Sequence, residues 1–281
     1  MSSLYQIVRN VERAAEEISK ADALIIGAGA GMGVDSGLPD FRGDQGFWKA
    51  YPAYGKLGLS FSDLANPGWF QRDPNLAWGF YGHRFNLYRE TSPHDGFHVL
   101  RRWSDKMKHG SFVFTSNVDG QFQKAGFSPQ RVVECHGSIS NFQCTTDCGV
   151  GVFSNQQPIN VDPATFRAFG KLPSCTKCGA LARPNILMFG DYGWDEGPSK
   201  AQKTMLLSWL NSVRDKKVVI VECGAGTAIP SVRMFCENLA GGMDATLIRL
   251  NIREHEVPEG GLGIPLGALK ALNMIDSLLH P

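Results

Sequence analysis

The stretch that decides the fold, residues 23–42, reads ALIIGAGAGMGVDSGLPDFR. Its first four residues are an apolar run, which predicts a short buried strand. The glycines that follow from Gly27 allow positive φ angles and let backbone N–H groups approach a pyrophosphate closely. The spacing is neither the ordinary dinucleotide fingerprint nor that of a P-loop, and a simple strand-to-helix turn would need no ligand. The glycines alone therefore leave nucleotide binding open.

The rest of the chain alternates apolar runs with helical stretches. Three further short runs, at 111–115, 218–222 and 246–251, end in polar or glycine-rich loops. Apolar residues at helical spacing predict helices at 4–20, 96–108 and 204–215. Strands that alternate with helices predict an α/β fold with a doubly wound, Rossmann-like parallel sheet.

Two stretches interrupt this alternation. Residues 45–91 are rich in aromatic residues, glycine and proline, and residues 141–184 carry paired cysteines with little periodicity. We expect both to be inserted between strands as one smaller domain, made of a helical insert and a zinc-binding module. The nucleotide-binding domain would then comprise residues 1–44, 92–140 and 185–281.

Composition limits the partners. The 281 residues carry a formal net charge of +1, so we expect no nucleic-acid partner. No window approaches the roughly 18 consecutive apolar residues of a membrane helix, and the first 22 residues contain no unbroken apolar segment of a secretory signal. We expect no membrane partner and a cytoplasmic location, or a nuclear one if the source is eukaryotic.

The cysteines indicate a metal. Their number, seven, is odd, which argues against a disulfide framework. Cys144 and Cys148 form one close pair and Cys175 and Cys178 another, so the four thiolates can surround one Zn²⁺ tetrahedrally at about 2.3 Å. Four protein ligands leave no open position, so this zinc would be structural. The alternative is four unrelated cysteines that are buried or reactive.

The end of the glycine-rich stretch carries a resemblance. From Gly29 to residue 42 the chain reads Gly-Ala-Gly, four further residues and Ser-Gly-Leu-Pro-Asp-Phe-Arg. This resembles the sirtuins, the NAD-dependent protein deacylases. Later stretches resemble the other motifs of that family in order and extend the resemblance over residues 20–275: 115–119 (TSNVD), 133–137 (VECHG), 183–184 with 189–191 (RP and FGD), 226–227 (GT) and Asn251.

The resemblance implies an NAD site with a catalytic base. His136 matches the base position, and an ordinary histidine pKa of about 6.5 suits removal of a proton from a ribose hydroxyl. Asn117 and Asp119 match catalytic positions that bind the nicotinamide carboxamide. Phe41 would shield the cleaved bond from water. The implied NAD contacts are Gly29, Ala30, Gly31, Asp40, Phe41, Arg42, Ser116, Asn117, Asp119, Gly226, Thr227 and Asn251.

Substrate residues follow from the same resemblance. Phe189 and Gly190 would line a tunnel for the acyl-lysine and offer backbone to a peptide strand. Tyr81 and Arg84 are similar to the Tyr-x-x-Arg pair with which some sirtuins hold acidic acyl groups such as succinyl. A guanidinium can bind a carboxylate through two hydrogen bonds. The alternative for this pair is an ordinary amphipathic helix.

Several positions depart from the family pattern and indicate a divergent branch. Ser116 stands for a glutamine, Gly33 and Ala228 stand for serines, and residues 121–122 (Gln-Phe) stand for Leu-His. The carboxamide and base positions are intact, so we expect NAD cleavage to be retained.

The expected function is that of an NAD-dependent protein-lysine deacylase, a deacetylase, a desuccinylase or both. It would act on acylated lysine in proteins or peptides and release nicotinamide and O-acyl-ADP-ribose. An NAD-dependent protein mono-ADP-ribosyltransferase is the alternative, because it would share nearly every site residue. A non-enzymatic NAD-sensing or zinc-dependent module is the third hypothesis, which His136 disfavours.

Overall fold

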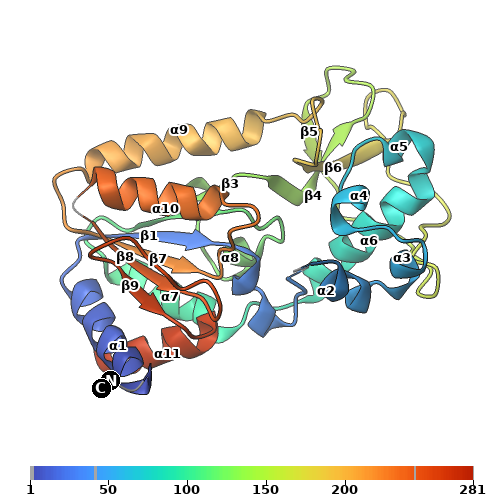
Figure 1. Cartoon of the computed structure of the whole chain (residues 1–281). Helices are drawn as coiled ribbons and strands as arrows, with labels where there is room; N and C mark the ends of the chain where they lie inside the picture. The colour runs from blue at the N-terminus through green and yellow to red at the C-terminus, as the bar shows by residue number, and fades with distance from the viewer. Residues whose placement is uncertain (1–2, 41–42, 244, 281) are drawn as a thin grey trace.

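The computed structural model describes residues 3–40, 43–243 and 245–280. Its larger sheet has six parallel strands in the order β3-β2-β1-β7-β8-β9 (Figure 1). The chain order runs outward from β1 on one side and from β7 on the other, so the boundary between them is the topological switch point, where such sheets bind ligands. The prediction of a doubly wound sheet is confirmed. The strands are β1 (Ala23–Ala28), β2 (Ser111–Thr115), β3 (Val132–Glu134), β7 (Val218–Cys223), β8 (Ala245–Leu250) and β9 (Leu262–Ile264).

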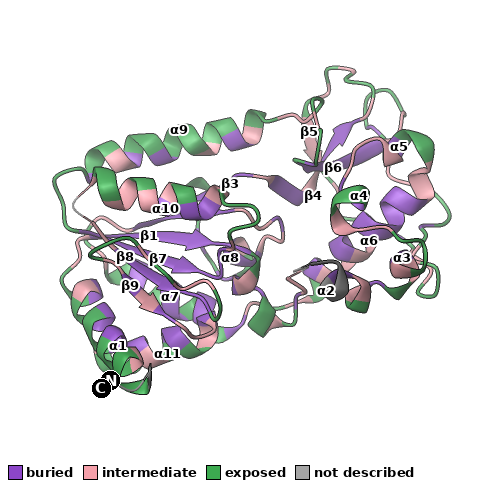
Figure 2. Cartoon of the chain, in the orientation of Figure 1, coloured by how far each residue is buried: buried purple, intermediate pink, exposed green. Residues whose placement is uncertain are grey.

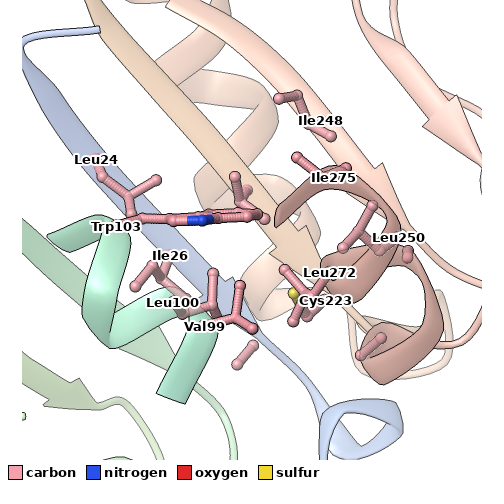
Figure 3. Packing of buried hydrophobic residues seen from close by; sticks show 14 of the residues in the cluster. Leu24, Ile26, Val99, Leu100, Trp103, Cys223, Ile248, Leu250, Leu272 and Ile275 are labelled. Carbon is pink, nitrogen blue, oxygen red and sulfur yellow. The ribbon is translucent and has the colours of Figure 1, made fainter. Parts of the chain in front are cut away.

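Helices cover both faces of this sheet. In β1, Leu24 and Ile26 pack in one apolar cluster, whereas Ala23 and Ile25 pack in another on the opposite face. Figure 3 shows the first cluster, in which Trp103 lies among residues of β1 and of the C-terminal helix. Burial of both faces explains why the strands read as unbroken apolar runs (Figure 2). The helices are α1 (Ser3–Ser19), α7 (Asp95–Lys106) and α11 (Ala268–Leu279) on one face, and α9 (Gly197–Ser212) and α10 (Ser231–Gly242) on the other.

A smaller part of the molecule combines the two interrupting stretches. The indole of Trp78 donates a hydrogen bond to the carbonyl of Ala182 (2.9 Å), and its ring packs on Phe142. These contacts join segments far apart in sequence into one aromatic core, as the predicted helical and zinc-binding insert requires. The exact domain boundaries stay a prediction. The elements are α2 (Gly43–Ala50), α3 (Pro52–Lys56), α4 (Phe61–Leu64), α5 (Trp69–Arg72), α6 (Pro74–Glu90) and the antiparallel strands β4 (Gly137–Cys144), β5 (Val152–Ser154) and β6 (Ala182–Ile186).

Some expectations need correction. The helix predicted at 204–215 begins at Gly197, because Pro198 suits a first helical turn, where its missing N–H is not needed. The strands β3 and β9, three residues each, lie at the edges of the sheet and were too short to predict. The glycine-rich stretch forms two 3₁₀ turns, η1 (Ala30–Met32) and η2 (Val34–Ser36). Short α8 (Gln121–Lys124) and η3 (Pro129–Arg131) complete the described elements. Among these helices none has the length and apolarity needed to span a membrane.

Candidate functional site

Two glycine turns meet at the switch point, one after β1 and one after β7. The N–H of Gly29 donates to the carbonyl of Cys223, and that of Gly31 donates to the carbonyl of Gly224, both at 3.0 Å. Gly224 has a φ of +62°, and a Cβ there would lie 2.4 Å from the backbone of Gly31. A Cβ on Gly29 would lie 2.7 Å from Ala225. The two turns therefore touch backbone to backbone, which only glycine permits.

The end of the first turn is fixed to neighbouring helices. Ser36 accepts a hydrogen bond from the backbone of His94 (3.0 Å), and Asp35 accepts one from the backbone of Leu269 (3.1 Å). Ala30 is exposed, whereas Gly31 and Asp40 are half-buried. Two predicted NAD contacts, Phe41 and Arg42, lie outside the described residues.

Asn251 follows β8 and closes the other side of the switch point. Its Nδ2 donates to the carbonyl of Ala225 (2.8 Å), and its Oδ1 accepts the backbone N–H groups of Arg253 and Glu254, both at 3.1 Å. The hydroxyl of Thr227 donates to the carboxylate of Glu254. The predicted residues Gly226, Thr227 and Asn251 thus lie together, and Glu254 joins them although its sequence position gave no signal.

Asn117 joins the end of β2 to the first glycine turn. Its Nδ2 donates to the carbonyl of Gly29 at 3.0 Å, and its backbone N–H donates to the hydroxyl of Thr115 at 3.0 Å. The backbone N–H of Ser116 donates to the carbonyl of Ala28 (3.1 Å). The residue predicted to bind the carboxamide is therefore held against the turn predicted to bind the phosphates.

Asp119 lies two residues further, half-buried, and its carboxylate accepts the N–H of Gln121 at 3.0 Å. Burial raises the pKa of this carboxyl, while that hydrogen bond and the positive charge of Arg84 act in the opposite direction. The charge of the predicted acyl-binding residue Arg84 therefore reaches the carboxyl of Asp119 in the predicted carboxamide loop.

His136 lies between β3 and β4, half-buried. Its Nε2 is 3.3 Å from the hydroxyl of Ser231, and the ring forms a hydrogen bond with the backbone of Ser116. Burial and then the charge of Lys203 lower its pKa, against the opposing effect of the Ser116 bond. The imidazole is therefore neutral near pH 7, as a general base must be. The contact with Ser116 places it beside the Asn117 loop.

A buried acid that we did not predict stands two residues before His136. Glu134 is 6% exposed, its Oε1 has no hydrogen-bond partner within the described residues, and Gln202, Ser138 and Gln123 lie near its carboxyl. Burial, with a smaller contribution from the charge of Asp119, raises its pKa to about 7. The stretch 133–137 contained this acid, but burial decides its protonation, and burial is a tertiary property.

The predicted acyl-binding residues lie among aromatic rings. Tyr81 and Arg84, both on α6, are buried. The guanidinium carbon of Arg84 lies 5.1 Å from the centre of the Phe80 ring and 5.9 Å from that of Phe61. The Phe61 ring in turn meets the ring of Phe189 edge to face at 6.3 Å, and Phe189 is 44% exposed. A path of contacts therefore leads from the surface at Phe189 through Phe61 to Arg84.

The loop that carries Phe189 and Gly190 is fixed by a buried ion pair. The guanidinium of Arg183 donates to both carboxylate oxygens of Asp191, and the two side chains are 5% and 1% exposed. Asp191 also accepts the N–H of Met188 (3.3 Å). Gly190 has a φ of +64°. The ion pair therefore anchors the loop that carries Phe189, the outer end of this path of contacts.

The four paired cysteines come together at one point. Their sulfur atoms all lie within 4.8 Å of one another, with 3.6 Å between Cys144 and Cys178 and 3.5 Å between Cys148 and Cys175. Tetrahedral Zn²⁺ with bonds of about 2.3 Å needs sulfurs about 3.8 Å apart. The cluster therefore fits the predicted structural zinc, which would tie the end of β4 to the loop before β6.

Known proteins share the sequence pattern and the fold of this chain. A family model described as the Sir2 family matches residues 29–245. The chain belongs to the Sir2 family. The sequence prediction of a sirtuin is thereby confirmed.

This Sir2 chain has curated relatives in archaea, bacteria and animals. It is 30% identical to NAD-dependent protein deacylase 2 of Pyrobaculum aerophilum over 85% of its own length and 83% of that protein. It is 31% identical to the mitochondrial NAD-dependent protein deacylase sirtuin-5 of Canis lupus familiaris, over 62% of its own length and 57% of that protein. The match with NAD-dependent protein deacylase 1 of Caldanaerobacter subterraneus, at 31% identity, covers 63% of this chain and 64%, less than two thirds, of that relative.

Solved Sir2 structures share its fold. A complex of a mutant Sir2 homologue with ADP-ribose superposes with a TM-score of 0.69 at 22% identity, over 95% of each chain. A Sir2 homologue in complex with NAD gives a TM-score of 0.67 at 22% identity, over 95% of this chain and 93% of that one. At such identities the likeness establishes the fold alone.

Proposed function

We propose that this protein is an NAD-dependent protein-lysine deacylase that transfers the acyl group to ADP-ribose and releases nicotinamide. One observation carries the proposal. The Asn117 loop contacts the first glycine turn through Gly29, the base His136 through Ser116, and the acyl pocket through the charge of Arg84 on Asp119. A nucleotide, a base and an acyl group would therefore meet at one loop.

Each part of this site has a chemical task. The backbone of the two glycine turns suits the pyrophosphate, because N–H groups without side chains can approach it closely. Cleavage of the nicotinamide–ribose bond develops positive charge on the ribose, and Asn117 and Asp119 would hold the leaving carboxamide. The acyl oxygen of the modified lysine would then attack the ribose carbon. His136, neutral near pH 7, would take the proton of a ribose hydroxyl.

Zinc has no place among these steps. Four cysteine ligands would complete its coordination, so its contribution is to hold the small antiparallel sheet that carries β6 and the entrance loop after it.

We further propose that acidic acyl groups, succinyl above all, are removed faster than acetyl. The support is the burial of Arg84 and Tyr81 at the inner end of the path from Phe189. A carboxylate is attracted more strongly by a guanidinium among apolar rings than by one in water. The relative named sirtuin-5 is a protein deacylase, which agrees with a broader acyl range than acetyl.

Mass spectrometry of matched peptides tests both proposals. Acetyl-lysine and succinyl-lysine peptides are incubated with NAD, and we expect each to lose one acyl mass and the succinyl peptide to react faster. His136→Ala should be inactive on both. A gain of ADP-ribose on the protein or peptide would instead support the mono-ADP-ribosyltransferase alternative.

The acyl preference has its own controls. Arg84→Ala should lower kcat/KM for the succinyl peptide about a hundredfold and spare acetyl, because an unpaired carboxylate would enter an apolar pocket. Arg89→Ala, on the exposed side of the same helix, should change neither. A strong preference for acetyl that Arg84→Ala leaves unchanged would rule out the desuccinylase proposal.

Acylated proteins are the proposed partners, in keeping with relatives named protein deacylases. The net charge of +1 disfavours a general electrostatic attraction to nucleic acid, and no nucleic-acid or membrane partner is proposed. The proposed cytoplasmic location awaits fractionation of cells that express the tagged chain.

A further inference from the structure

Arg84 has a neighbour on its own helix that no motif indicated. The Nε of Arg84 donates a hydrogen bond to the hydroxyl of Tyr88 at 3.0 Å, four residues further along α6. Tyr88 is 5% exposed, and its ring centre lies 5.4 Å from the guanidinium carbon. Tyr81, the partner that the sequence predicted, contributes its ring face at 5.7 Å. Within the described contacts, the hydroxyl that fixes the guanidinium is therefore that of Tyr88.

This bond has a consequence for carboxylate binding. A guanidinium is planar, so a hydrogen bond to Nε fixes the plane in which the two terminal nitrogens lie. It also directs a carboxylate to those terminal nitrogens and away from the edge that contains Nε. A tyrosine hydroxyl that accepts a hydrogen bond keeps its own proton to donate. Tyr88 can therefore add a donor to the pocket while it orients Arg84.

The end of the same helix is tied to the carboxamide loop. Lys124 of α8 donates to the carbonyl of Tyr88 (2.6 Å) and to those of Arg89 (2.7 Å) and Thr91 (3.0 Å). Gln121, which stands where the family usually has leucine, also donates to the carbonyl of Thr91 (3.1 Å). The last turn of α6 is thus held against the segment that begins at Asp119, beside the proposed nicotinamide pocket.

We propose that Tyr88 is a specificity-determining residue that positions Arg84 for acyl groups ending in a carboxylate. The inference rests on the proposed deacylase function and extends it, since it names a second phenol beside the Tyr-x-x-Arg pair. An acetyl group has no carboxylate and gains nothing from this arrangement. Tyr88 therefore acts on the choice of acyl group and leaves NAD cleavage unchanged.

The test is Tyr88→Phe, which removes one hydroxyl and keeps the ring. We expect KM for a succinyl-lysine peptide to rise about tenfold, as for loss of a hydrogen bond to a charged group, with kcat and the acetyl-lysine reaction unchanged. The matched control is Tyr54→Phe. Its hydroxyl is also buried and donates to the carbonyl of Phe166 (2.6 Å), so it reports the effect of losing a buried hydroxyl in the same aromatic core.

The outcomes separate the two levels of the proposal. If Tyr88→Phe raises KM equally for both peptides, or for neither, the role of Tyr88 is overturned while the deacylase function stands. Wild-type protein that removes acetyl but not succinyl would overturn it as well. If wild-type protein is inactive on both peptides, the proposed function has failed. In that case calorimetry measures the affinity of the succinyl-lysine peptide for both proteins. Equal affinity for wild type and Tyr88→Phe would overturn the role of Tyr88.

Discussion

The turns after β1 and β7 meet through backbone atoms, whereas the surroundings of Arg84 are made of side chains from α4, α6 and the loop after β6. In the first region the contacts leave no room for a Cβ at Gly29 or Gly224. In the second region the contacts are made by aromatic side chains, which a substitution changes directly. The region suited to NAD is thus built from backbone atoms, and the region suited to the acyl group is built from side chains.

The two regions should therefore fail in different ways. A single methyl group in the first should damage nucleotide binding, while a change in the second should alter the choice of substrate or the fixation of the entrance loop.

The buried ion pair tests the acyl side. Asp191→Asn leaves the charge of Arg183 buried without its counter-charge, which should lower the free energy of unfolding by about 3–5 kcal/mol. Urea unfolding measures this, and KM for the acyl peptide should rise because the entrance loop loses its anchor. The control is Asp105→Asn in the exposed pair with Arg101, which should cost about 0.5 kcal/mol or less. Similar costs for both variants would show that the loop is held by other contacts.

Gly224→Ala tests the nucleotide side. The added methyl group meets the backbone of Gly31 and demands a strained φ, so unfolding should become easier by about 3 kcal/mol. Calorimetry should show at least a tenfold weaker affinity for ADP-ribose. Gly110→Ala is the matched control, because its φ of +69° is similar and nothing lies within 4 Å of its Cβ. It should cost about 1 kcal/mol and leave ADP-ribose binding intact.

Glu134, buried at the end of β3, predicts a pH dependence of stability. Its pKa of about 7 exceeds the ordinary value near 4.3, so the unfolded chain loses this proton at lower pH than the folded one. Below about pH 4 this group therefore leaves the free energy of unfolding unchanged. As the pH rises from there through 7, the group lowers the free energy of unfolding. Glu134→Gln should raise the free energy of unfolding by about 2 kcal/mol at pH 8 and hardly at pH 4.

Chemical unfolding at several pH values measures the effect. Glu259→Gln, on an exposed turn, should keep the wild-type pH dependence. If Glu134→Gln keeps the wild-type pH dependence of the free energy of unfolding, another group is responsible for it.

The smallest expected effect concerns the base. The charge of Lys203 is the second cause, after burial, that lowers the pKa of His136. Lys203→Gln should raise that pKa, so the acid limb of the pH–activity profile should move to higher pH. We expect about a twofold loss of kcat/KM at pH 6 and no change at pH 8. Lys200→Gln, one turn earlier on α9, is the control, and an identical shift there would assign the effect to net charge.

Features that depend on short spacing and on backbone conformation could be predicted from the amino-acid chain alone. The apolar runs predicted the sheet, the glycines after Gly27 predicted a tight turn, and the paired cysteines predicted the sulfur cluster. The order of the motifs identified the family. A glycine turn or a close cysteine pair is a local feature, because it constrains only its immediate neighbours.

Which residues act together depends on contacts that the fold creates. Phe61 lies between Phe189 and Arg84, Thr227 meets Glu254, and Glu134 is buried beside the catalytic loop. Even the bond from Arg84 to Tyr88, though local in sequence, has meaning only because both side chains are buried beside Asp119. The physical reason is that burial sets both the pKa of a carboxyl and the strength of a charge–carboxylate contact, and burial is produced by segments that are distant in the chain.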